Sequence, residues 1–161
     1  MSAIATTTVI PIAALEVVKA AAPPRKSFLG GKKDGFPTAL AQHGRALEVF
    51  EGSGYLLATV LVYLDEKHGI DLMHSRHDEV ASAITKARGS TFFILGEEHL
   101  SHAGKLTGIG TSVDELAGYF NAFNEAQEGP EIGEAMRDGI RFLARALEAV
   151  TPGNVVLLAI L

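Results

Sequence analysis

Four of the six histidines occur as two closely spaced pairs, and imidazole serves both as a metal ligand and as a general base. The pairs are His74 with His77 and His99 with His102. A separation of three residues puts both rings of a pair on one side of a helix. We therefore predict that these four residues could hold a divalent metal ion. Glu98 and His99 are the candidate catalytic groups, either of which could act as a general base.

These histidines also have a structural interpretation. The sequence predicts a helix start near Ser75, which leaves His74 outside that helix. His77 continues the apolar stripe of the same helix, as a half-buried core residue would. His99 and His102 fall in an expected loop, where a spacing of three residues does not by itself bring two rings together. The sequence therefore leaves both a metal site and a set of structural histidines open.

The second candidate site is the segment Gly96–Ser112, which is expected to be a loop between a buried strand and a capped helix. Glycines allow a ligand to approach the backbone closely, and free amides at a helix start favour an anion. The candidate anion-binding residues of this segment are Lys105, Thr107, Gly108, Gly110, Thr111 and Ser112. The alternative is a surface loop whose glycines form turns, because Asp114 and Glu115 already complement the helix dipole and would repel phosphate.

A row of arginines recurs every four residues on the last predicted helix, at Arg137, Arg141 and Arg145. Guanidinium groups bind carboxylate or phosphate through two parallel hydrogen bonds, so Arg137 and Arg141 are candidate anion-binding residues. The alternative is a solvated helix face on which acidic neighbours such as Glu134 and Asp138 balance the arginines. The spacing alone does not decide between the two.

The elements that position these residues indicate a layered fold. Four short runs that are rich in β-branched or aromatic residues and lack alternation are typical of buried strands: residues 6–10, 59–64, 91–95 and 154–161. Helical periodicity or capping residues mark five further segments: 13–22, 37–52, 75–87, 112–123 and 130–150. We predict an α/β or α+β fold, in which one layered domain over residues 1–161 has a short, mostly buried sheet of about four strands covered by about five helices. Residues 25–35, rich in glycine and basic side chains, are predicted to form a flexible loop.

Two of these assignments depend on a choice. Residues 55–68 could form a buried helix that ends at Gly69 or a strand, and the β-branched residues within 59–62 favour the strand. The apolar C-terminal run 154–161 must lie centrally in a sheet or under a partner subunit. An exposed hydrophobic edge of this kind would aggregate.

Composition restricts the function further. The chain has 161 residues, no cysteine and a formal net charge of −5. The absence of cysteine excludes disulfides, thiolate metal sites and a cysteine nucleophile, and the acidic balance argues against nucleic-acid binding. No apolar stretch reaches the length of about 18 residues that a membrane span needs, and no basic region precedes the apolar N-terminus. We therefore expect a cytoplasmic protein that binds neither nucleic acid nor membranes.

No catalytic set is complete in this sequence. We therefore predict a small soluble protein-binding module of the kind that acts as an inhibitor or an immunity protein. One alternative is a small hydrolase or transferase whose anion- or metal-binding site lies in Gly96–Ser112. Another is a structural protein that forms homo-oligomers through its apolar termini. The expected partner is a protein or a small anionic ligand, and a divalent metal is the one cofactor that these residues could bind.

Overall fold

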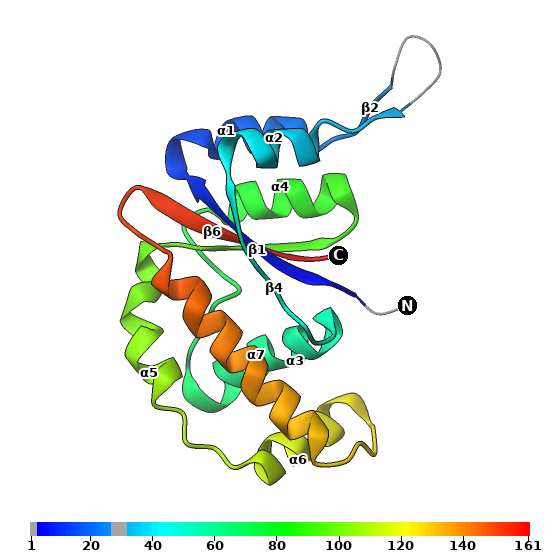
Figure 1. The fold of residues 1–161 in the computed structure, drawn as a ribbon, viewed down its shortest axis with the longest axis vertical. Coiled ribbons are helices and arrows are strands. Elements are labelled where there is room, and N and C mark those ends of the chain that lie inside the picture. Colours follow the sequence, from blue (N-terminus) through cyan, green and yellow to red (C-terminus); the bar gives the residue numbers. More distant parts are fainter. Residues whose placement is uncertain (1–2, 27–31) are drawn as a thin grey trace.

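In a computed structural model, which describes residues 3–26 and 32–161, the chain folds around a four-stranded antiparallel sheet with helices on both faces (Figure 1). Its strands are β1 (Ala5–Pro11), β4 (Arg45–Val49), β5 (Thr91–Leu95) and β6 (Asn154–Ile160), in the spatial order β4-β1-β6-β5. An antiparallel sheet covered by helices belongs to the α+β class, which confirms the predicted fold at that level.

The predicted 25–35 loop is partly structured. It contains two short antiparallel strands, β2 (Arg25–Lys26) and β3 (Lys32–Lys33), which pair with each other. The intervening residues 27–31 lie outside the described part of the chain, so the predicted flexibility of that stretch is not tested.

The helices fall into two groups, one on each face of the sheet (Figure 1). The described residues form the α-helices α1 (Leu15–Ala21), α2 (Phe36–His43), α3 (Gly54–His68), α4 (Asp78–Arg88), α5 (Ala103–Thr107), α6 (Val113–Asn124) and α7 (Glu131–Glu148), and the 3-10 helices η1 (Ile12–Ala14) and η2 (Glu97–His102). Helices α1, α2 and α4 cover one face, and α3, α6 and α7 cover the other. On β6, Val155 and Leu157 pack with the first group, whereas Val156 and Leu158 pack with the second.

Strand β6 is central, with a neighbour on each side. It pairs with β1 from Ala5 opposite Ile160 to Pro11 opposite Asn154, and it pairs with β5 from Thr91 opposite Ile160. Both faces of β6 are covered, which explains why its sequence is continuously apolar instead of alternating. Three of the four predicted strands are thus confirmed, and the C-terminal strand is buried within this chain without a partner subunit.

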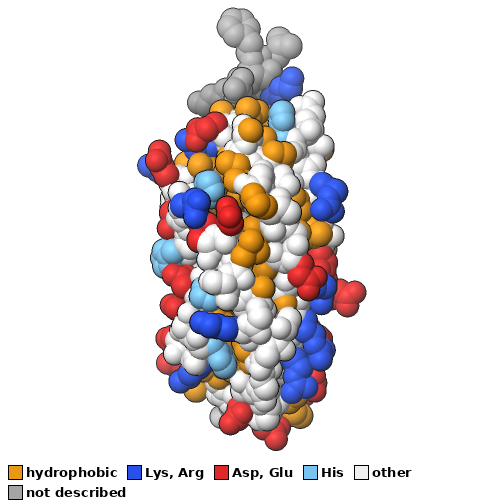
Figure 2. All heavy atoms as spheres, turned by 90° about the vertical axis from the view of Figure 1, so that its left-hand side faces the viewer, with side chains coloured by type: hydrophobic (Ala, Val, Ile, Leu, Met, Phe, Trp, Pro, Cys, Tyr) orange, Lys and Arg blue, Asp and Glu red, His pale blue; other side chains and the backbone are white. Residues whose placement is uncertain are grey.

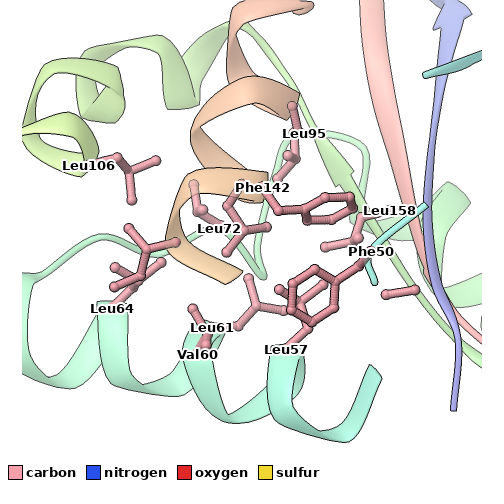
Figure 3. Packing of buried hydrophobic residues seen from close by; sticks show 14 of the residues in the cluster. Phe50, Leu57, Val60, Leu61, Leu64, Leu72, Leu95, Leu106, Phe142 and Leu158 are labelled. Carbon is pink, nitrogen blue, oxygen red and sulfur yellow. The ribbon is translucent and has the colours of Figure 1, made fainter. Parts of the chain in front are cut away.

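The fourth predicted strand, 59–64, is wrong, because these residues form the middle of helix α3. The Ser53 hydroxyl caps the helix start by accepting the Tyr55 N–H at 3.3 Å, and Gly69 ends the helix in the left-handed conformation with φ 62°. The helix lies between α7, α6 and the sheet, so its apolar residues do not form one stripe. Figure 3 shows α3 side chains such as Leu57 and Leu61 directed into the same core as Phe142.

The predicted helix 37–52 is correct only in its first half. Helix α2 ends at His43, Gly44 is extended with ψ 168°, and the chain continues as β4 at the edge of the sheet. A Cβ atom at position 44 would lie 2.7 Å from Thr8 Cγ2 and 2.8 Å from the Leu40 carbonyl oxygen. The close approach of α2 to β1 therefore requires glycine at the point where the helix turns into the strand.

The predicted helix caps are confirmed in part. Ser112 and Glu115 form the expected reciprocal box at α6: Ser112 Oγ accepts the Glu115 N–H at 3.2 Å, and the Glu115 carboxylate accepts the Ser112 N–H at 3.2 Å. Near α4 the reciprocal pair is incomplete. Asp78 accepts the Ser75 N–H at 2.7 Å, but Ser75 Oγ accepts from His77, and the helix begins three residues later than predicted.

No helix within residues 3–26 and 32–161 is both long enough and apolar enough to cross a lipid bilayer.

Candidate functional site

The expected loop Gly96–Ser112 is helical over residues 97–107, which corrects the prediction there, whereas residues 108–112 lie outside any helix. Residues 97–102 form η2 and residues 103–107 form α5, so the histidines and Lys105 lie on short helices. Gly108 has ordinary right-handed helical angles. We call η2 the 97–102 turn.

His99 is the most deeply buried of the predicted site residues, at 2% exposure, and both of its ring nitrogens have partners. Nδ1 accepts the Gly96 N–H at 2.9 Å, and Nε2 lies 2.8 Å from the carbonyl oxygen of His74. These contacts assign a neutral ring that carries its proton on Nε2 and donates it to His74. His99 thus ties the 97–102 turn to the segment before α4. Coordination of a metal would break one of these bonds, and so would base catalysis by this ring.

Glu98 is also held by the neighbouring segment. Its Oε1 accepts the Arg76 N–H at 2.7 Å, and the Arg76 Nε lies 3.1 Å from Oε2, although not in the direction of a hydrogen bond. Burial alone would raise the pKa of Glu98, but the Arg76 N–H, its own backbone amide and the nearby Arg76 charge lower it overall. A carboxylate with a lowered pKa is a weak proton acceptor, so these contacts favour a structural role over a catalytic one.

The other predicted metal ligands do not converge with His99. His74 is exposed, with Nδ1 2.8 Å from Asp71 Oδ2, and this hydrogen bond and the Asp71 charge raise its pKa. His102 has a buried Nδ1 without a hydrogen-bond partner, and burial followed by the Lys105 charge lowers its pKa. Figure 2 shows histidines spread over the face that carries them.

The described part of the chain holds no group of three or more histidine, aspartate or glutamate side chains that could bind a metal ion. The predicted metal site therefore has no support in the geometry.

Most of the remaining candidates meet at a hollow between α7 and the chain around α5 and the start of α6. We call it the arginine groove, and its volume is about 510 Å³. One wall consists of Leu106, Thr107, Ile109, Gly110, Thr111 and Leu116, and the other of Arg137, Ile140, Arg141, Ala144, Arg145 and Glu148. Five of the eight predicted anion-binding residues line it: Thr107, Gly110, Thr111, Arg137 and Arg141. Lys105, Gly108 and Ser112 are not part of its lining.

The three arginines of the groove differ in how completely they are neutralised. Arg145 makes two hydrogen bonds to the Glu48 carboxylate, at 2.6 and 3.0 Å, which raise its pKa. Arg141 is paired with its helix neighbour Asp138 at 3.0 Å. Arg137 is half-buried, with its side chain 33% exposed, and its ion pair with Glu134 is long, at 3.5 Å. The guanidinium of Arg137 is therefore the most available for an added anion.

The rest of the groove is largely apolar. Leu106, Leu116 and Ile140 are buried, and the half-buried Ile109 and Ala144 extend the same surface. Apolar side chains of this kind bind the hydrocarbon part of a ligand, while the arginines bind a charged head.

The hydroxyl groups near the groove are mostly engaged. Thr107 Oγ1 donates to the Gly104 carbonyl oxygen at 3.1 Å, as a helical threonine commonly does. Ser112 takes part in the helix cap described above. Thr111 Oγ1 lies 2.7 Å from the hydroxyl of Tyr63, a residue of α3 that the sequence did not mark as functional.

Two features of the groove have no signal in the sequence. The apolar lining residues follow the usual helical pattern of core positions, and nothing in the spacing links 106–116 to 137–148. Tyr63 lies in the stretch that was predicted as a strand. The arginine row, by contrast, is visible in the sequence, including Arg145.

Comparison with protein-family models, curated proteins and solved structures gives no match for this chain.

Proposed function

We propose that this chain is a non-catalytic binding module that holds a small anionic ligand with an apolar body in the arginine groove. One observation carries the proposal: a row of guanidinium groups borders an apolar floor in a hollow of about 510 Å³. Small-molecule sites typically have volumes of about 300–1,000 Å³, with a mostly apolar lining and a few polar groups that fix orientation. A carboxylate head would bind beside Arg137, and its hydrocarbon part would lie on Leu106, Leu116 and Ile140.

The sequence predicts a protein-binding module whose partner is a protein or a small anionic ligand. We keep the binding role and propose the small anionic ligand as the partner. A protein interface of standard size buries about 800 Å² on each partner, which requires a broad complementary surface. The arginine groove is a local hollow, and its charged and apolar groups suit one amphipathic molecule. Its acidic residue Glu148 would oppose an anion at that position, so the head group is placed near Arg137.

The hydrolase or transferase alternative gains no comparable support. Its candidate base residues, Glu98 and His99, are bonded to Arg76, Gly96 and His74 within the fold. The proposal therefore assigns binding without a reaction.

The test compares three eight-carbon probes that share a tail and differ in their heads: octanoate, octanol and octylamine. Binding is measured by isothermal titration calorimetry and by NMR shifts of the methyl groups that line the groove. We expect octanoate to bind more tightly than octanol, and octylamine to bind most weakly, because only the carboxylate pairs with arginine. Equal affinity for octanoate and octanol would overturn the proposal.

Arg137→Gln tests the head-group position, with Arg45→Gln as its matched control. Both variants remove one positive charge, but Arg45 is an exposed residue of β4 that does not line the groove. We expect Arg137→Gln to weaken octanoate binding by about tenfold, and Arg45→Gln to change it by less than about twofold. Equal losses in the two variants would mean that octanoate senses only the net charge of the protein.

A further inference from the structure

A chain of hydrogen bonds runs from His68 through Tyr63 to Thr111, which lines the arginine groove. The Tyr63 hydroxyl lies 3.0 Å from His68 Nε2 and 2.7 Å from Thr111 Oγ1. Tyr63 is only 4% exposed, and its ring packs edge-on against His68 and Tyr119, at centroid distances of 5.2 and 4.9 Å. The phenol oxygen is thus fixed in place by packing, and it has a partner on each side.

The protons shared by His68, Tyr63 and Thr111 allow two arrangements of hydrogen-bond direction. A phenol oxygen carries one proton, so Tyr63 donates to one neighbour and accepts from the other. If His68 donates from Nε2, Tyr63 donates to Thr111, and the Thr111 proton is left to donate elsewhere. If His68 accepts at Nε2, Tyr63 donates to His68, and Thr111 donates its proton to Tyr63. In the second arrangement Thr111 presents only lone pairs to its other neighbours.

We propose that Thr111 donates its hydroxyl proton to the anionic head in the arginine groove, and that Tyr63, held by His68, is the positioning residue that frees this proton. The inference rests on the proposed function, because it assumes that the groove binds an anion. An anion favours the first arrangement, since lone pairs on Thr111 would repel it. Thr111 is suited to this role because the other two predicted hydroxyl donors, Thr107 and Ser112, are engaged in the backbone and in the helix cap.

The arrangement extends recognition beyond the arginine row. Arginines provide charge but can pair with a head group in several positions. A hydroxyl whose oxygen is fixed can donate to a head group in only one position. The buried Tyr63 comes from α3, whereas the three arginines come from α7. An anion in the groove and a proton on His68 Nε2 would each favour the first arrangement, in which Tyr63 donates to Thr111, so they would stabilise each other.

The test measures octanoate and octanol affinity in Thr111→Val, Thr111→Ser, Tyr63→Phe and the double variant Tyr63→Phe/Thr111→Val. Thr111→Val keeps the shape of the side chain and removes its hydroxyl. We expect it to weaken octanoate binding by about tenfold and to leave octanol binding unchanged, whereas Thr111→Ser should stay within about twofold of the wild type. Tyr63→Phe should weaken octanoate binding by about threefold, because the Thr111 proton is no longer directed.

The double variant distinguishes positioning from a merely structural role. If Tyr63 acts through Thr111, the double variant should bind octanoate as Thr111→Val does, without further loss. A purely structural Tyr63 would lower thermal stability in Tyr63→Phe but leave octanoate affinity intact, and that result would overturn the inference. Wild-type octanoate affinity in Thr111→Val would overturn it as well.

The two proposals fail in different ways. If octanoate and octanol bind wild-type protein equally, the proposed function itself fails. If Arg137→Gln weakens octanoate binding but Thr111→Val does not, the groove binds anions and only the role of Thr111 and Tyr63 is wrong.

Discussion

The 97–102 turn and the arginine groove both contain polar side chains that the sequence marks as candidate site residues, but these side chains are bonded differently in the two regions. In the turn, His99 has a partner at each ring nitrogen, and Glu98 accepts from the Arg76 backbone. In the groove, Arg137 has only a long ion pair and lies over apolar side chains. The hydrogen-bonding groups of the turn hold it to the segment before α4, whereas the groove keeps hydrogen-bond donors that a ligand could use.

The comparison shows that residue type and clustering do not identify a site by themselves. A site needs hydrogen-bonding groups that remain available after the fold has made its own contacts. A group that is already bonded must lose that bond before it can bind a ligand or a proton. Substitutions in the turn should therefore change stability and leave octanoate binding intact. Substitutions of residues that line the groove should weaken octanoate binding and leave stability nearly unchanged.

The largest expected effect is that of His99→Leu in the turn. Leucine fills a similar space but leaves the buried Gly96 N–H and the His74 carbonyl oxygen without their partner. We expect the free energy of unfolding to fall by about 3 kcal/mol, measured by urea denaturation. His74→Ala is the control, since it keeps the carbonyl that His99 bonds and should cost less than about 1 kcal/mol. Equal losses in the two variants would contradict the structural role of His99.

The next effect concerns Gly133, which lies near the start of α7 where this helix packs against Val113 at the start of α6. A Cβ atom there would lie in direct collision with the carbonyl oxygen of Val113. We expect Gly133→Ala to lower the free energy of unfolding by about 2 kcal/mol and to weaken octanoate binding. Gly133 does not line the groove, so a loss of both stability and octanoate binding would show that the groove depends on the packing of α6 on α7.

Gly118→Ala is the control for Gly133→Ala. Gly118 lies inside α6, and nothing comes within 4 Å of a Cβ atom built there. Alanine should therefore stabilise the helix by about 0.5–1 kcal/mol and leave octanoate binding unchanged. A destabilised Gly118→Ala variant would mean that the loss at Gly133 reflects the glycine backbone and not the contact with Val113.

Much of the fold can be predicted from local signals. Strands β5 and β6 are mainly apolar runs and β1 is rich in β-branched residues, while α6 begins with a capping box and α7 carries one clear apolar stripe. Helix α3 is missed because a helix covered on several sides has no polar stripe, and its β-branched residues then favour a strand. Strand β4 is missed because Arg45–Val49 contains residues common in helices, and its pairing with β1 overrides that preference.

The candidate site is less accessible to sequence reasoning. The arginine row and the residues Thr107, Gly110 and Thr111 are visible as separate features, but only the tertiary fold brings them to one groove. His99 is prominent for its type, yet its two hydrogen bonds depend on the backbone positions of Gly96 and His74. Spacing along the chain carries no information about which hydrogen bonds the fold itself will use.

A smaller effect is expected for Glu98→Gln, and it depends on pH. The pKa of Glu98 is lowered in the folded protein from its usual value of 4.5, so its contacts stabilise the fold fully above pH 4.5. That contribution is lost as the pH falls through the lowered folded-state value. We expect the variant to be less stable than wild type by about 1 kcal/mol at neutral pH, with the gap closing in acid.

Urea denaturation of wild type and Glu98→Gln at several pH values isolates this effect, because other carboxylates such as Asp71 and Asp34 titrate equally in both proteins. A gap that is constant with pH would contradict a stabilising role for the ionised Glu98 carboxylate. Octanoate binding should be unchanged, as for the other substitution in the turn.

The smallest effects concern two histidines, His102 and His74, whose pKa values are shifted in opposite directions. Burial, followed by the Lys105 charge, lowers the pKa of His102, so the folded state resists its protonation and loses stability as the pH falls below 6.5. The Asp71 hydrogen bond and charge raise the pKa of His74, so its contribution is fully present below pH 6.5 and is lost as the pH rises through the raised value. Relative to wild type, His102→Gln should therefore become more stable, and His74→Gln less stable, as the pH is lowered from about 8 to about 5. Thermal unfolding across that range measures both slopes, and slopes of the same sign would show that His102 is not held neutral by its surroundings in the turn.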